Sequence, residues 1–427
     1  MMNLFTRFKK DYFNYLISII LPALIAGLAV PVLKNILGAE KYGEFSLYFN
    51  AALICTAVMT GWITQSIFRF YPSTKDKSLF ARHSIAIAIR TQFFFYLPII
   101  IIVWYLKSDI LLGILICMVV FMNSMQFAHI AIAQSSFLSK KTIFSETIRS
   151  VSYILIAITF LLIYPGAFLY ILFIAIFISY LLSVLYLRIQ TRHFLLENSK
   201  EKDESLNYKK LSNQFIKYGF PLSMWIVFSY LLSYIDKLLI LQNLGPKAQG
   251  NYQAIFDLLF RGLTILISPV TISLLPLLTH AYEKSEKKEI KQLMKKILFF
   301  ELGGLLVSSV LYWLFGAHLL FVILKVPDTG TYRLMGFIIL VGTFIWQMAI
   351  VIHQRFILKL KSHVLLFMIA TAFFSQAVFY WFIADLQNPL SYPFGYLIAS
   401  SMYLLLVSLS QFPAVLKSLI RHIKFII

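Results

Sequence analysis

The sequence has little charge for its length and almost no cysteine. Of its 427 residues, 13% are Asp, Glu, Lys or Arg, whereas 60% are hydrophobic and the mean hydropathy is +0.80. A soluble protein carries about 25% charged residues, roughly twice this share. The two cysteines, Cys55 and Cys117, lie in apolar stretches without metal-ligand spacing. The composition therefore excludes a soluble globular protein and a disulfide-stapled secreted domain.

The sequence also lacks the short motifs of common enzyme classes. It contains no HExxH, no GxSxG and no P-loop. The segment that follows Arg7, Lys9 and Lys10 is too long for the apolar region of a signal peptide, so we expect it to remain as a helix. We expect a protein that is not an enzyme and that needs no cofactor and no metal.

Apolar segments long enough to cross about 30 Å of hydrocarbon recur along the chain. Twelve are predicted, near 13–33, 44–68, 83–106, 110–137, 143–163, 166–187, 215–242, 251–276, 297–316, 333–354, 363–384 and 390–414. The fold class is an all-α polytopic membrane protein. A polar segment separates the sixth span from the seventh. The predicted division is an N-terminal six-helix lobe over 1–187, a charged linker over 188–214 and a C-terminal six-helix lobe over 215–427.

The positive charge is distributed as membrane topology requires. The chain has 38 Lys and Arg against 18 Asp and Glu, a net charge of +20. Most of the basic residues fall in the two ends, the linker and alternate loops, which the positive-inside rule assigns to the cytoplasm. Both termini should be cytoplasmic, and the charge does not indicate nucleic-acid binding. Six spans per half give both lobes the same orientation, as in a parallel pseudo-twofold repeat.

A polar turn recurs at corresponding places in the two halves. LGAEKYGEF carries Gly38 and Gly43, and LGPKAQGNY carries Gly245 and Gly250, with an aromatic residue two positions after the second glycine in each case. Such a duplication within a membrane protein is typical of a transporter. Prolines inside the first span, Pro22 and Pro31, interrupt helix hydrogen bonding. They could be static kinks or hinges.

Ionisable residues inside the spans are candidates for a functional role, because a charge at the bilayer centre costs about 3 kcal/mol on insertion scales. The candidates are Arg69, Arg90, Glu146, Arg149, Asp236, Lys237, Asp257 and Arg261. Glu146 with Arg149, and Asp257 with Arg261, could neutralise each other along one helix face. Arg69 and Arg90 could instead extend to lipid headgroups.

Taken together, the charges inside the spans favour an anionic substrate. Basic residues there match or exceed acidic ones, and arginine offers bidentate hydrogen bonds to a phosphate or pyrophosphate. We expect Arg69, Arg90, Arg149, Lys237 and Arg261 to bind it. Asp236 is the leading candidate for ion coupling, with Asp257 as a second.

The pattern LP-x-LI-x(5)-P-x-L-x(3)-LG-AEKYGEF-x(23)-RF resembles the Wzx-type (O-antigen) flippases of polysaccharide biosynthesis. The blocks YGFP, LSYIDKLLI, LGPKAQGNY and LLFRG of the second half resemble the corresponding region of that family. The family belongs to the multidrug/oligosaccharidyl-lipid/polysaccharide exporter superfamily. The resemblance implies two six-helix lobes around a central cavity, as in the multidrug (MATE) branch. It places Arg69, Arg261, Asp236 and Lys237 at matching motif positions.

The resemblance also implies a substrate and partners. The substrate would be an oligosaccharide on polyprenyl pyrophosphate, moved by alternating access across the bacterial cytoplasmic (inner) membrane for O-antigen or capsule synthesis. H⁺ or Na⁺ would drive it, and membrane lipids and the polysaccharide polymerase machinery would be partners. The nearest alternative is a cation-coupled multidrug exporter, which would need acidic cavity residues. A membrane polymerase or ligase would need a sizeable far-side loop, and a scaffold would not explain the buried charges.

Overall fold

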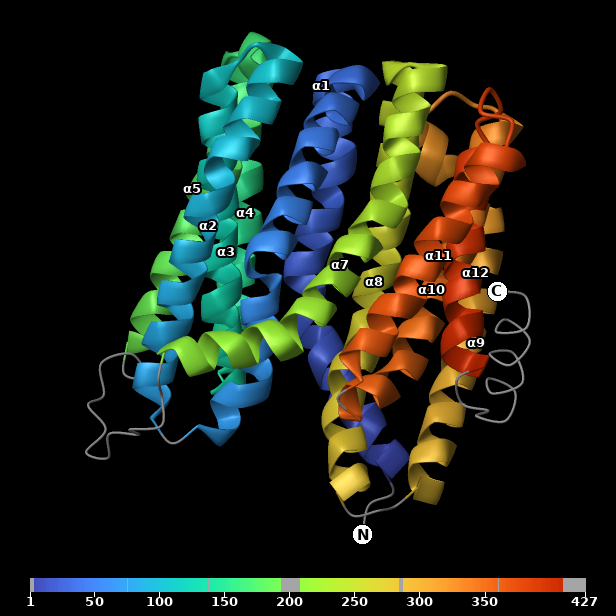
Figure 1. Ribbon diagram of the computed structural model, residues 1–427. Helices are drawn as coiled ribbons and strands as arrows, with labels where there is room; N and C mark the ends of the chain where they lie inside the picture. The colour runs from blue at the N-terminus through green and yellow to red at the C-terminus, as the bar shows by residue number, and fades with distance from the viewer. Residues whose placement is uncertain are drawn as a thin grey trace. The chain divides into compact units, whose positions relative to one another are not determined.

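The computed structural model describes residues 4–74, 76–136, 138–192, 208–283, 287–359 and 361–409, and all regular elements there are helical (Figure 1). The α-helices are α1 (Leu4–Phe70), α2 (Lys77–Lys107), α3 (Ile110–Ser135), α4 (Ser139–Ile163), α5 (Phe168–Gln190), α7 (Tyr208–Leu244), α8 (Pro246–Glu283), α9 (Lys287–Ala317), α10 (Gly330–Leu358), α11 (Ser362–Phe382) and α12 (Ser391–Leu409). Two 3₁₀ turns, Tyr71–Ser73 and Pro165–Ala167, and a π-helical turn, His318–Ile323, complete them.

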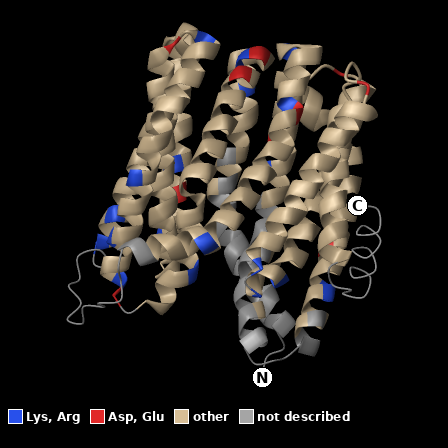
Figure 2. Ribbon diagram, in the orientation of Figure 1, with Lys and Arg blue, Asp and Glu red and all other residues tan. Residues whose placement is uncertain are grey.

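The predicted membrane architecture is confirmed. In the described part of the chain, ten helices are long and apolar enough to cross a membrane. The twelve predicted spans correspond to eleven helices, because α1 contains the first two. Most of the helix surface carries neither sign of charge (Figure 2). Large apolar side chains are exposed on the outer helix faces, such as Phe94 (81%), Leu306 (68%) and Trp381 (82%), as lipid contact requires.

The first polar turn is shorter than the sequence suggested. Residues 34–43 do not form a loop between two spans. They are helical except at Gly38, which has φ 78° and ψ 170°. Gly245, with φ 85°, separates α7 from α8 in the same way. A positive φ suits glycine because it has no Cβ to clash with the backbone. The two matching turns therefore share a glycine with positive φ as well as a similar sequence.

Two compact units divide the chain: an N-terminal unit, Leu24–Tyr234, and a C-terminal unit, Met1–Ala23 with Ile235–Ile427. Their boundaries fall inside α1 and α7. The lobes predicted over 1–187 and 215–427, with a linker over 188–214, stay a prediction, and linker residues 193–207 lie outside the described part.

The same order of helix packing recurs within each unit. In the N-terminal unit α3 packs against α2 and α5, and α4 packs against α5. In the C-terminal unit α10 packs against α9 and α12, and α11 packs against α12. The core of the N-terminal unit includes Ile63, Ile67, Ala128 and Phe215, all at most 1% exposed. Because the third to sixth predicted spans of each half pair in the same way, the duplication extends beyond the turns.

Candidate functional site

Asp236 is the centre of a buried polar cluster in the C-terminal unit. Its side chain is 0% exposed. One carboxylate oxygen accepts hydrogen bonds from Gln376 Nε2 and Tyr380 Oη, both at 2.6 Å, and the other accepts one from Tyr252 Oη at 2.9 Å. Three donors therefore replace the water that this carboxylate lost on burial.

The local sequence explains how the cluster forms. Asp236 precedes the Gly245 turn and Tyr252 follows it at a similar distance along the chain, so the turn brings them together across α7 and α8. Gln376 and Tyr380 are four residues apart on α11 and therefore share one helix face. The Tyr380 hydroxyl lies 3.1 Å from the backbone oxygen of Tyr392, which links the cluster to α12.

Lys237 is buried next to this cluster. It is 1% exposed, and its Nζ lies 5.2 Å from the centre of the Phe256 ring, a cation–π contact. The charges of Asp257, Asp236 and Arg261 all act on it. The fold thus brings together the four ionisable candidates of the second half. With two acids and two bases, the group carries no net charge when all four are ionised.

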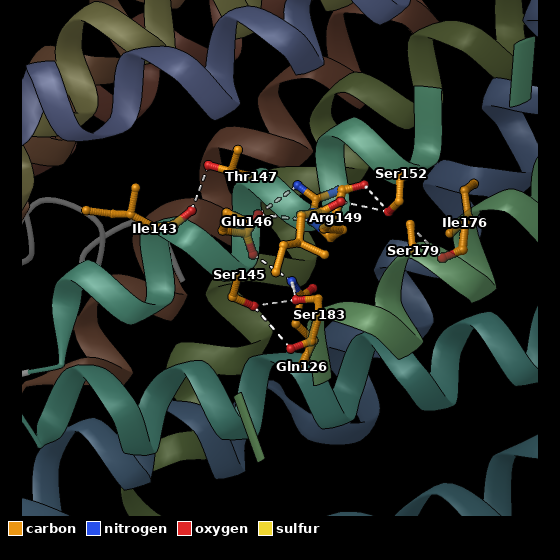
Figure 3. Close-up of polar contacts among 11 residues, drawn as sticks. Gln126, Ile143, Ser145, Glu146, Thr147, Arg149, Ser152, Ile176, Ser179 and Ser183 are labelled. Carbon is orange, nitrogen blue, oxygen red and sulfur yellow. Dashed lines mark hydrogen bonds and ion pairs between the residues drawn. The ribbon is translucent and has the colours of Figure 1, made fainter. Parts of the chain in front are cut away.

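Arg149 has a partner of opposite charge in the N-terminal unit (Figure 3). Its Nε and Nη2 donate to one oxygen of Glu146, at 3.0 and 2.8 Å. The guanidinium also lies 5.5 Å from the centre of the Tyr180 ring. The other Glu146 oxygen accepts from Gln126 Nε2 at 2.7 Å. Neutralisation of Glu146 by Arg149, one of the alternatives from the sequence, is therefore present in the structure.

A further layer of hydrogen bonds supports this ion pair. Gln126 Nε2 also lies 2.8 Å from Ser183 Oγ, and Ser183 Oγ lies 2.5 Å from Ser145 Oγ (Figure 3). These contacts join α3, α4 and α5 through side chains that would otherwise be unsatisfied in an apolar interior. The Arg149 cation is thus held in place by its neighbours.

Arg69 and Arg90 are both exposed. Arg69 lies in the last turn of α1. Arg90 shares a face of α2 with Phe94, Leu97 and Ile101, which are between 51% and 81% exposed. An arginine on such an apolar stripe suits contact with lipid headgroups. The substrate-binding roles of both residues stay predictions.

The hinge candidates lie in helix. Pro22 and Pro31 are buried within α1, whose one non-helical residue is Gly38. Pro22 stands next to the boundary between the compact units at Ala23 and Leu24. Gly43 and Gly250 are buried too. Whether any of them acts as a hinge stays a prediction.

Several side chains of these clusters were not among the sequence candidates. Gln376 and Tyr380 could have been found as a polar pair four apart in an otherwise apolar span. Glu301, a buried acid of α9 that belongs to neither cluster, could have been found as the single acid between Lys296 and Asp328. Among the described residues, no three His, Cys, Asp or Glu side chains are placed to hold a metal ion.

Comparisons with solved structures define the class of the fold. A transporter of the MOP superfamily from Pyrococcus furiosus Vc1 has a TM-score of 0.72 at 10% identity, over 97% of this chain and 96% of that one. A mutant of the Vibrio cholerae MATE transporter VcmN has a TM-score of 0.69 at 14% identity, over 95% and 97%. An outward-facing MATE family transporter has a TM-score of 0.71 at 12% identity, over 96% of each chain. The chain therefore has the fold of MOP-type membrane transporters.

The family follows from the sequence match. The model of the polysaccharide biosynthesis protein family matches residues 8–282, which is more than half of the chain. The chain belongs to this family, and the resemblance stated from its motifs is confirmed. A search of curated proteins finds no match to the chain.

Proposed function

We propose that the protein is a flippase for polyprenyl-pyrophosphate-linked oligosaccharides in surface polysaccharide synthesis. The observation that carries the proposal is its family membership, joined to a transporter fold that has basic side chains within its spans. The neighbour from Pyrococcus furiosus is described as a MOP superfamily transporter whose binding pocket has reverse polarity. The fold alone therefore does not impose a cationic substrate.

The mechanism is alternating access. Arginine and lysine groups attract the pyrophosphate, and the lipid tail stays in the bilayer while the sugar head crosses. Arg69 is exposed and Arg261 is half-buried, so their guanidinium groups are more accessible than the buried Lys237. Arg149 takes part only if the pyrophosphate displaces Glu146. Bending near Pro22 is supported by the boundary between the compact units at that point.

Asp236 couples the cycle to an ion gradient. Its carboxylate is held by two tyrosine hydroxyls and one amide, and no ion pair involves it among the described residues. Binding of H⁺ or Na⁺ would change the charge of the Asp236 site and thereby the donors from which its carboxyl group accepts hydrogen bonds. A gradient drives transport only if the ion binds the two conformations with different affinity. Asp257 is a second coupling candidate through its electrostatic action on Lys237.

The test is transport of a defined polyprenyl-pyrophosphate oligosaccharide into proteoliposomes, with and without an imposed H⁺ or Na⁺ gradient. Asp236→Asn should reduce transport with a gradient to the level measured without one. Arg261→Ala should weaken substrate binding, seen as a higher substrate concentration for half-maximal transport. Glu44→Gln is the matched control, because Glu44 belongs to the other compact unit and forms a partly exposed ion pair with Lys107.

The competing function is a cation-coupled multidrug exporter. The proteoliposomes would then expel cationic dyes and would not move any lipid-linked sugar, and this outcome would reject the flippase. If the sugar moves and neither variant alters its movement, the flippase stands and the residue roles are wrong.

A further inference from the structure

Glu301 is a buried carboxyl that none of the mechanism above uses. It lies in α9, where its side chain is 3% exposed. Neither of its two oxygens has a hydrogen-bond partner, and no ion pair involves it among the described residues. Asp236, by contrast, accepts three hydrogen bonds. Two buried acids in one unit thus have opposite surroundings.

The side chain of Glu301 points inward from a helix whose other faces are apolar and exposed. Phe300 and Leu302 beside it are 47% and 41% exposed. Ile297, one turn earlier, and Tyr312, three turns later, lie on the same buried stripe, at 0% and 4%. Helix α9 packs against α8 and α10. Glu301 is therefore enclosed by helices of the C-terminal unit.

No charged group of α10 lies at the level of Glu301. A Cβ on Gly304 would touch Phe344 at 3.4 Å, which fixes the register of the antiparallel helices α9 and α10. In that register Glu301 is level with Gln347. The nearest titratable residue of α10 is then His353, six residues away, or about 9 Å along the axis.

The other described elements that pack closely against α9 are α8 and the π-helical turn that follows α9. On α8, residues 262–279 contain no charged or histidine residue, and Arg261 and His280 flank that stretch. On α9 itself the nearest charge is Lys296, about 7.5 Å away along the axis. The π-helical turn after α9 contributes only His318, about 25 Å away by the same rise.

These surroundings decide which form of the carboxyl is stable. An ionised carboxylate without a partner in an apolar interior costs far more free energy than a neutral one, so such a group keeps its proton. We propose that Glu301 is a proton-binding site of the C-terminal unit, which holds its proton in this conformation and releases it when α8, α9 and α10 rearrange to admit water. The site is separate from Asp236, and its use in transport rests on the proposed function.

The protonation state can be measured without any transport assay. Infrared spectra of the full chain in membranes are recorded at neutral pH for the native protein and for Glu301→Gln, and the spectrum of the variant is subtracted from that of the native protein. Expected is loss of one carboxylic-acid carbonyl band, with the small frequency shift in D₂O that an exchangeable acid proton causes. Loss of carboxylate bands instead would overturn the proposal. Glu44→Gln, which removes a partly exposed carboxyl in an ion pair, is the control that should lose carboxylate bands.

A second arm tests the release of the proton. Glu301→Gln mimics the protonated form permanently, so in proteoliposomes it should reduce gradient-driven transport at least tenfold while leaving substrate exchange without a gradient within twofold. Full gradient-driven transport by this variant would show that the proton is never released, and would reject that part of the proposal. If no variant or native protein moves the sugar at all, the proposed function fails while the infrared result for Glu301 still stands.

Discussion

The contact between α7 and α1 at Gly219 allows a sharp test of the packing in the N-terminal unit. A Cβ on Gly219 would lie 1.9 Å from the carbonyl oxygen of Trp62 and 2.6 Å from Ser66 Oγ. Ordinary non-bonded separations are about 3.5 Å, so Gly219→Ala would force the two backbones apart by about 1.5 Å. The hydrogen bond from Ser66 Oγ to Phe215 O, at 3.3 Å, would be lost.

Overpacking of this kind costs about 1 to 3 kcal/mol of unfolding free energy. Gly303→Ala is the matched control, because a Cβ there meets nothing within 4 Å. Alanine should instead stabilise α9 at that position by up to about 1 kcal/mol through its helix propensity. The assay is thermal unfolding of the purified protein in detergent, followed by tryptophan fluorescence. If Gly219→Ala unfolds at the same temperature as Gly303→Ala, the close approach of α7 and α1 is wrong.

Two further predictions concern the turns and a helix cap. Gly38→Ala and Gly245→Ala should each cost about 1 to 3 kcal/mol, because a positive φ is unfavourable for alanine, and thermal unfolding measures this. Unchanged unfolding temperatures would contradict the positive φ. Asp109 caps α3, and the hydroxyl of Tyr170 and an amide of α3 hold the pKa of its carboxyl below the usual value. Tyr170→Phe should therefore raise this pKa and move the loss of the cap, as pH falls, to higher pH. A carboxyl NMR titration checks it, and an unchanged pKa would refute it.

The length of the apolar segments predicted the helices well, because a chain in hydrocarbon must satisfy its backbone hydrogen bonds within each helix. The ends were less predictable. α7 begins at Tyr208 and α9 at Lys287, seven and ten residues before the predicted spans, since helix continues beyond the apolar segment. Residues 34–43 were expected to form a loop from their polarity, but Gly38 alone breaks the helix.

Which side chains become partners depends on which helix faces meet, and the sequence alone does not determine this. The spacing of Glu146 and Arg149 predicted their contact because both lie on one helix. The contacts of Asp236 with Gln376 and Tyr380 span 140 residues or more of chain, and no local pattern encodes them. The substrate roles of Arg69 and Arg90 depend on which surface becomes a cavity, and so stay predictions.

Asp236 and Glu301 show why a buried acid cannot be interpreted from its depth alone. Both lie in apolar spans of the same unit, yet Asp236 is surrounded by donors whereas no donor among the described residues lies within hydrogen-bond distance of Glu301. The same acid-to-amide change therefore perturbs them differently. Asn at position 236 would turn an NH₂ group toward one or more of the donors that now point at the carboxylate, and a buried donor left unpaired costs about 1 to 3 kcal/mol. Gln at position 301 faces no such donor and differs from the neutral acid mainly in lacking a releasable proton. A loss of function in Glu301→Gln with unchanged unfolding would thus report on the proton itself, whereas the same loss in Asp236→Asn has to be separated from a structural change.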